Sequence, residues 1–112
     1  MSLKEVDRLK KDFHVEILKV YERAKSEVKY NATRFIRMYS EKGGYETAQI
    51  LLHMSDVTGG FTEMWKRGRM DLTIECFVLK PKWRPLFTEE DLNIARNRLR
   101  KYGHEPAQCE EG

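Results

Sequence analysis

Apolar residues recur every three or four positions through the first quarter of the chain, a spacing that predicts a long helix over residues 4–28. The core-facing stripe comprises Val6, Leu9, Phe13, Ile17, Val20, Ala24 and Val28. Val15 and Leu18 fall on the other side of this helix, three residues apart. A helix of about 25 residues extends about 38 Å, which is long for a small domain. Val15 and Leu18 are therefore interface candidates for another protein or a second copy of this chain, unless they are isolated surface residues.

Shorter patterns divide the remainder of the chain. Helices are predicted over residues 32–42, 45–53, 61–67, 71–79 and 88–103, with a loop over residues 80–87. Asn31 is the predicted cap of the first of these helices, which Gly43-Gly44 would end. Thr88 opens the last helix with a capping-box pattern.

Residues 71–79 are also rich in residues that favour strands. We favour a helix here, because no other segment offers a partner strand and a lone strand is not stable. The predicted fold is therefore all-α: a single compact domain over residues 4–103, with five or six helices and a long N-terminal helix.

Composition adds limits to this picture. The chain has 112 residues, the size of one domain with one core, and 35% of them are charged. No apolar run approaches the roughly 20 residues that cross a bilayer, and the charged N-terminal segment lacks the apolar core of a signal peptide. We expect no membrane partner and a cytoplasmic location. Residues 104–112 are predicted to be a polar tail, and Met1-Ser2-Leu3 and Glu111-Gly112 to be vector-derived.

The two cysteines, Cys76 and Cys109, lack both metal-ligand spacing and the density of a disulfide scaffold. We predict two reduced thiols, with Cys76 in the core. His14, His53 and His104 lie far apart, without the short spacings of metal ligands. No cofactor or metal is predicted.

Glu75 stands within an apolar segment, and an ionised carboxylate is costly to bury unless cations or hydrogen-bond donors meet it. We predict a buried ion pair that joins helices, with Arg69 or Arg34 as the partner and Asp71 close by. An enzyme is the alternative. In that case Arg69, Asp71, Glu75 and a histidine would converge on a pocket in which burial raises the pKa of Glu75.

Basic residues gather beside tryptophans in the second half of the chain. Residues 66–101 hold ten Lys and Arg against five Asp and Glu, while the other segments hold 11 against 13. Lys and Arg neutralise phosphates and Trp rings stack on bases, so this surface is a nucleic-acid candidate. A solvated basic face with buried tryptophans is the competing interpretation. The candidates are Trp65, Lys66, Arg67, Arg69, Lys80, Lys82, Trp83, Arg84, Arg96, Arg100 and Lys101.

A helix-turn-helix over residues 32–53 is a sharper form of this hypothesis. The helix that would read bases carries Glu46, Thr47, Gln49 and His53 but no Lys or Arg. It therefore has little with which to hold phosphate or read guanine, which disfavours this motif.

One resemblance rests on a set of short motifs across residues 30–102. They are Asn31-Ala32-Thr33-Arg34-Phe35, Gly43-Gly44, Glu46-Thr47-Ala48, Leu51-Leu52-His53, Gly60-Phe61-Thr62, Trp65, Gly68-Arg69, Asp71-Leu72-Thr73, Glu75, Leu86-Phe87-Thr88, Ala95-Arg96 and Leu99. This pattern resembles a small uncharacterised bacterial family of all-helical domains. The resemblance implies a bacterial-type domain and no particular activity.

These observations predict a protein-interaction or accessory module, of which a homodimer is one form. The alternative is a nucleic-acid-associated protein that uses the basic, Trp-containing surface. Nothing in the sequence matches a nucleotide-binding loop or a nucleophile motif, so an enzyme is the weaker hypothesis.

Overall fold

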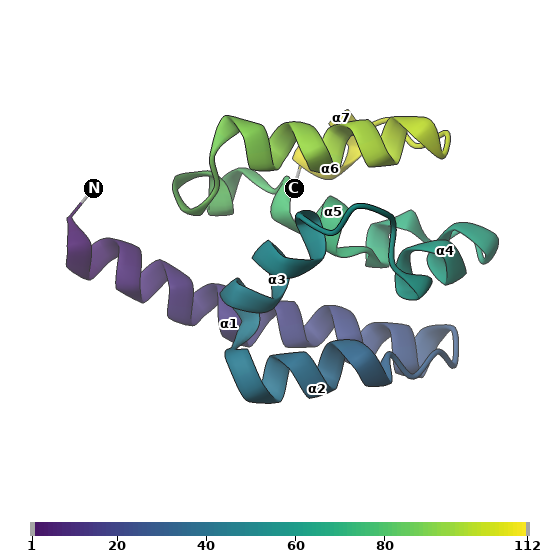
Figure 1. Ribbon diagram of the computed structural model, residues 1–112, viewed down its shortest axis with the longest axis horizontal. Coiled ribbons are helices and arrows are strands. Elements are labelled where there is room, and N and C mark those ends of the chain that lie inside the picture. Colours follow the sequence, from purple (N-terminus) through teal and green to yellow (C-terminus); the bar gives the residue numbers. More distant parts are fainter. Residues whose placement is uncertain (1, 112) are drawn as a thin grey trace.

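Helix α1, Leu3–Glu27, forms one long side of the molecule, and its first turns extend beyond the rest of the chain (Figure 1). The hydroxyl of Ser2 caps the helix by accepting a hydrogen bond from the backbone N–H of Glu5 at 3.2 Å. The apolar stripe faces inward as predicted. Phe13, Ile17 and Ala24 are buried, and the remaining members of the stripe are half-buried.

The computed structural model describes residues 2–111, in which every regular element is helical and no strand occurs. After α1 come α2 (Thr33–Lys42), α3 (Gly44–Leu52), α4 (Gly59–Lys66), η1 (Met70–Leu72), α5 (Ile74–Val78), η2 (Pro81–Leu86), α6 (Glu89–Lys101) and α7 (Ala107–Glu110). The all-α prediction is confirmed, with more helices within residues 2–111 than the five or six expected. Met1 and Gly112, two of the residues predicted to be vector-derived, lie outside the described part.

The helices lie in three layers (Figure 1). Helix α2 runs back beside α1, α3 and α5 occupy the middle, and α6 covers the opposite side. The α1–α2 pairing is made by side chains: the Tyr39 ring stacks on His14 and its hydroxyl donates to the His14 carbonyl at 2.8 Å. Helix α4 and the α1–α2 turn meet at one end of these layers. That end contains the cavity described below.

The predicted helix over residues 71–79 is broken at Thr73, whose backbone is extended. The Thr73 hydroxyl donates to the Met70 carbonyl at 2.8 Å and accepts from the Cys76 N–H at 3.1 Å. One side chain thus ends η1 and caps α5. The predicted loop over residues 80–87 contains η2, which starts at Pro81.

Asn31 does not cap α2, contrary to the prediction. The cap position falls on Ala32, which offers no side-chain bond, and Asn31 instead accepts a hydrogen bond from the Tyr21 hydroxyl at 2.9 Å. Lys29 adopts a positive φ of 59°, which turns the chain sharply after α1. That turn brings the Asn31 amide beside α1 and leaves the start of α2 uncapped.

Helices α1 and α3 cross closely at Gly44. A Cβ at this position would lie 2.8 Å from the Ile17 Cγ2 atom and 2.9 Å from the His14 Cα atom. The His14 Nδ1 atom also accepts the Gly44 N–H at 2.9 Å. The α1–α3 crossing therefore depends on a residue without a side chain.

Substitution Gly44→Ala is expected to lower the free energy of unfolding by about 1–3 kcal/mol, because the added methyl group must displace α1 backbone. Urea titration followed by circular dichroism measures the change. Gly59→Ala is the matched control, since a Cβ there meets no atom within 4 Å and should change stability by less than about 0.5 kcal/mol. Equal effects would contradict the close crossing.

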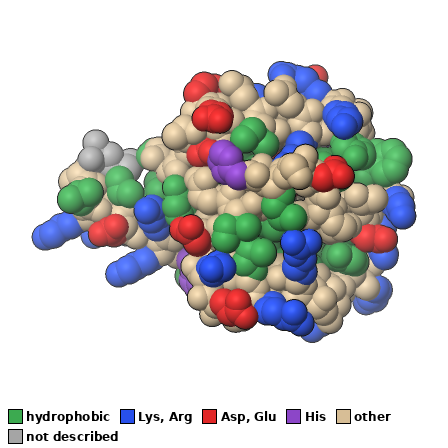
Figure 2. Space-filling view, in the orientation of Figure 1, with side chains coloured by type: hydrophobic (Ala, Val, Ile, Leu, Met, Phe, Trp, Pro, Cys, Tyr) green, Lys and Arg blue, Asp and Glu red, His purple; other side chains and the backbone are tan. Residues whose placement is uncertain are grey.

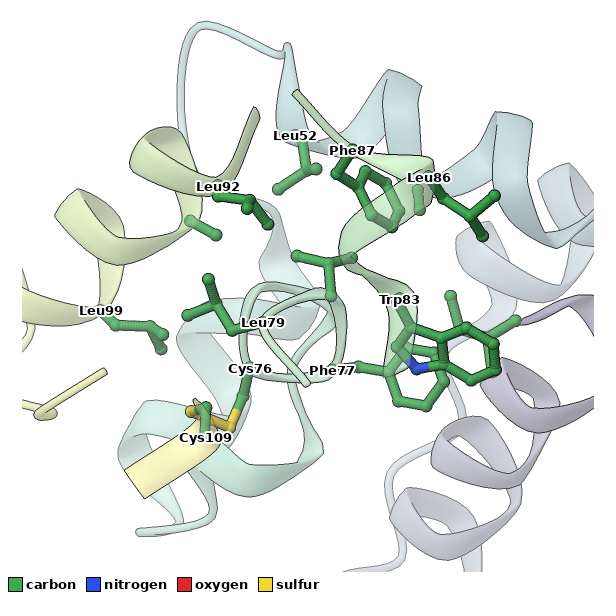
Figure 3. Close-up of a cluster of buried hydrophobic side chains, with 14 of the residues drawn as sticks. Leu52, Cys76, Phe77, Leu79, Trp83, Leu86, Phe87, Leu92, Leu99 and Cys109 are labelled. Carbon is green, nitrogen blue, oxygen red and sulfur yellow. A yellow bond between two sulfur atoms is a disulfide. The ribbon is translucent and has the colours of Figure 1, made fainter. Parts of the chain in front are cut away.

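The central core gathers aromatic rings from distant segments (Figure 3). Trp83 is 1% exposed, and its ring lies 5.2 Å from that of Phe13 and 5.6 Å from that of Phe77. Phe13 also packs on Phe87 with centroids 5.5 Å apart. Edge-on and tilted contacts of this kind add to the apolar burial. Trp83 is therefore a core residue and cannot stack on a base.

The cysteines are joined, contrary to the prediction of two free thiols. Cys76 and Cys109 form a disulfide between α5 and α7, and both residues are buried (Figure 3). Pro106 is also fully buried. Residues 104–111, expected to be a polar tail, therefore include a helix that packs on the core. Cys109 and Pro106 hold this segment against the core. The sequence did not indicate this, because most of the residues around them are polar.

No helix among residues 2–111 combines the length and the apolar character needed to cross a bilayer. The cytoplasmic location stays a prediction. Disulfides persist mainly in oxidising compartments, so the Cys76–Cys109 bond does not favour it.

Reduction of the disulfide, or Cys109→Ser, is expected to lower the free energy of unfolding by about 2–4 kcal/mol, because the bond closes a loop across 33 positions. Thermal and urea unfolding with and without a phosphine reductant measures the loss. The Cys109→Ser variant is the control, since reductant should not affect it further. A wild-type protein indifferent to reductant would contradict the bond.

Candidate functional site

Glu75 lies in the first turn of α5 and is 3% exposed. Its partner is Arg98 of α6, in place of the predicted Arg69 or Arg34: Arg98 Nη1 donates to Glu75 Oε2 at 3.1 Å. The expected pairing of this carboxylate with an arginine is therefore confirmed, but the arginine is a different one. It is 23 positions away and reaches Glu75 only because α5 packs on α6.

Arg98 also binds the end of α3. Nη1 donates to the Leu51 carbonyl at 3.0 Å, and Nη2 donates to the Met54 carbonyl. The last carbonyls of a helix have no partner within the helix, so the guanidinium satisfies them together with the carboxylate. With its side chain 13% exposed, Arg98 joins α3, α5 and α6 in one buried polar contact.

Burial raises the pKa of Glu75 above its ordinary value, while the residue's own backbone N–H and the positive charge of Arg98 act in the opposite direction. The folded protein therefore holds this proton more tightly than the unfolded chain does. The stability that Glu75 contributes is fully present below its unfolded pKa and is lost as pH rises through the folded pKa.

The free energy of unfolding of the wild type, minus that of Glu75→Gln, is expected to fall as pH rises above about 4.3, the ordinary pKa of Glu. Urea titrations over a pH series measure it. Asp71→Asn is the opposite control: Arg69 lowers the pKa of Asp71, so the contribution of Asp71 should be lost as pH falls. A Glu75 difference that grows with pH would show that Arg98 outweighs burial.

A cavity of about 260 Å³ adjoins Glu75 and is bounded by α1, the start of α2, α4 and the η1–α5 segment. Its walls are mostly apolar. Four aromatic rings line it, those of Tyr21, Tyr30, Phe35 and Phe61. The exposed residues among its lining, Thr33, Arg34 and Gly59, mark its rim. The sequence contained no signal for this cavity, because it is formed by segments far apart in the chain.

Four hydroxyl or carboxyl side chains on the cavity wall have known partners: that of Tyr21, which donates to Asn31, and those of Thr58, Thr73 and Glu75. The Thr58 hydroxyl accepts the Phe61 N–H at 3.1 Å, and the Thr73 hydroxyl is used at the α5 cap. Glu75 Oε2 is bonded to Arg98, whereas Oε1 accepts no hydrogen bond from another residue within 2–111. A carboxylate has about four lone-pair sites, so Glu75 is a cavity-lining acceptor that its known partners do not fill.

Arg69 and Asp71 form an ion pair, but at the surface and outside the cavity lining. Arg69 Nε donates to Asp71 at 3.0 Å and Nη2 donates to Glu27 at 2.7 Å. Bonds from Arg23 and Arg69 lower the pKa of Glu27 to about 2. Arg34 does line the cavity, where it is exposed and its Nη2 lies 4.0 Å from the Met54 sulfur.

The histidines do not join Glu75, and none of the three lines the cavity. His53 lies on the other side of α3, where Nε2 is 2.7 Å from Oδ1 of Asp91 and Gln49 bonds the same carboxylate. The convergence required by the enzyme hypothesis is therefore not formed. Gln49 and His53 are engaged with α6 and are unavailable for base reading. His104 lies beside the disulfide, with a ring nitrogen within 4.8 Å of both sulfurs.

Four of the nine basic candidates, Arg67, Arg69, Lys82 and Arg96, pair with nearby acids. Lys82 pairs with Glu16 at 2.6 Å, Arg67 with Glu63 at 3.3 Å, and Arg96 with both Glu89 and Glu110 at 2.8 Å. Exposed and without a salt bridge among residues 2–111 are Lys66, Lys80, Arg84, Arg100 and Lys101. Acidic and basic side chains intermingle on the face that Figure 2 shows.

The two tryptophans differ in their exposure to solvent. Trp83 is in the core, while Trp65 is 47% exposed and packs edge-on against Tyr102 at 5.5 Å. The predicted surface thus keeps one of its two stacking rings. On α1, Val15 is 58% exposed and Leu18 is half-buried, so the interface candidates amount to one apolar side chain and part of another.

No protein-family model, curated protein or solved structure matches the chain. The resemblance to a small bacterial family stays a prediction. The cavity and the buried ion pair beside it are therefore the features that indicate a function.

Proposed function

We propose that the chain is a protein-interaction or accessory module that takes an apolar side chain of a partner into the cavity beside Glu75. One observation carries the proposal: an apolar space of about 260 Å³ whose rim includes exposed residues and whose wall carries a buried acid. Concave apolar sites with a few placed polar groups are the usual form of a binding site.

The size of the cavity supports a side chain over a cofactor. Pockets that enclose small-molecule ligands typically measure about 300–1,000 Å³, so a space of about 260 Å³ is at the lower limit. It suits one large side chain better than a nucleotide or flavin. Interfaces derive most of their affinity from a few such anchors that fill pockets.

The rim provides a surface around such an anchor. Thr33 and Arg34 begin α2, and Gly59 begins α4, so two helix starts face a chain bound at the mouth. Arg34 adds a cation that can bind a carboxylate or carbonyl of the partner. An apolar centre with a polar rim is the ordinary composition of a protein interface.

The outer face of α1 supports this function less well. Val15 is exposed there, but the exposed residues around it include Lys11, Asp12 and Lys19. Charged residues are depleted at interface centres. A homodimer remains one form of the proposal, with a side chain of the second copy as the anchor. The nucleic-acid alternative is not favoured, because Trp83 is buried and four of its basic candidates are ion-paired.

Substitutions that fill or cover the cavity are expected to weaken partner binding. Ala24→Phe places a ring in the space from α1, and Thr33→Trp covers it from the exposed rim, where folding is less affected. Each change should weaken binding at least about tenfold, because loss of an anchor is a large effect. Partners captured by crosslinking in the source cells would be purified, and their affinities measured by calorimetry.

Val15→Glu is the control for this experiment, together with circular dichroism to show that each variant folds. It should bind as the wild type does. If Val15→Glu loses binding while both cavity variants keep it, the contact lies on the outer face of α1 and the cavity proposal is wrong.

A further inference from the structure

We infer that the anchor taken into the cavity is an aromatic ring bearing one neutral hydrogen-bond donor, an indole N–H or a phenol O–H, that bonds the carboxylate of Glu75. This inference rests on the proposed function and specifies the chemistry of the partner. It follows from three properties of the cavity: its acceptor, its charge and its aromatic walls.

The hydrogen-bond acceptor of the cavity is the carboxylate of Glu75. Arg98 uses Oε2 of Glu75, while Oε1 accepts no bond from another residue in the described chain. A carboxylate offers about four lone-pair sites, and an apolar group pressed against it would leave a buried acceptor unsatisfied. That arrangement is unfavourable. An occupant that reaches Glu75 must therefore bring a donor.

The charge of the site selects a neutral donor. Arg98 already balances Glu75, and Arg34 adds a positive charge at the rim. A Lys or Arg anchor would therefore enter a site whose three side chains sum to one positive charge. An Asp or Glu anchor would meet the Glu75 carboxylate within the cavity. Each would also lose its hydration without a full partner. A neutral N–H or O–H avoids both penalties.

The walls select a ring. Tyr21, Tyr30, Phe35 and Phe61 surround the space, and aromatic pairs favour edge-on or offset contacts. The Tyr21 hydroxyl already donates to Asn31, so Tyr21 contributes its ring to the cavity wall. Trp and Tyr combine a large apolar ring with one polar hydrogen, and both are enriched among interface anchors. Phe lacks the donor, and Ser or Thr would leave most of the space empty.

Two isomeric probes test the donor. 3-Methylindole keeps the ring N–H, whereas 1-methylindole replaces it with a methyl group at the same total size. In ¹⁵N-edited NMR titrations of the full chain, 3-methylindole is expected to bind at least about tenfold more tightly. Its shifts should centre on the amides of Thr33, Gly60 and Thr73. N-acetyltryptophanamide, which represents a Trp within a polypeptide, should shift the same amides.

The double variant Glu75→Met with Arg98→Met removes both charges together, since removing one alone leaves an unpaired buried ion. If it folds, the two isomers should bind it equally. The isomer comparison on wild type stands whether or not this variant folds.

The outcomes separate the two proposals. Equal binding of the isomers to wild type overturns the donor and leaves the interaction module intact. Binding of 3-methylindole without N-acetyltryptophanamide shows a site for a free small molecule and overturns the protein partner. If no probe shifts the cavity amides, the cavity does not accept an aromatic ring and this inference falls, while the cavity-filling variants decide the interaction module separately.

Discussion

The carboxylate of Glu75 lies in the core, and the packing of three helices depends on how its charge is met. An unpaired ionised acid at this depth would be strongly unfavourable. Arg98 reaches it from α6 and also binds the carbonyls of Leu51 and Met54 at the end of α3. One guanidinium thus serves a side chain and a helix terminus together. Helices α3, α5 and α6 cannot shift independently without exposing one of these groups.

The same pair determines the polarity of the cavity. Arg98 bonds one oxygen of Glu75, and Glu75 also lines the space bounded by Tyr21, Phe35 and Phe61. One residue thus belongs both to the structural ion pair and to the cavity wall. This double use gives a physical reason to keep a buried acid where an apolar pair of similar volume would serve stability as well.

Sequence reasoning succeeded where the signal was local. The apolar stripe of α1 and the capping box of α6, made by Thr88 and Asp91, follow from spacing alone. The need of Glu75 for an arginine was also predictable from burial energetics. Its identity was not, because Arg69 is nearer in sequence but is held by Glu27 and Asp71. The cavity and the disulfide depend on how distant segments meet, and no spacing within one segment encodes that.

The disulfide has a topological consequence for this site. It joins Cys76 directly after Glu75 to Cys109, so Arg98 lies inside a covalent ring that also contains the exposed Lys82 and Arg84 of η2. A protease that cuts the chain once within η2 would place Glu75 and Arg98 on different fragments. The two fragments would remain one molecule, with the acid still tethered to its arginine, until a reductant separated them.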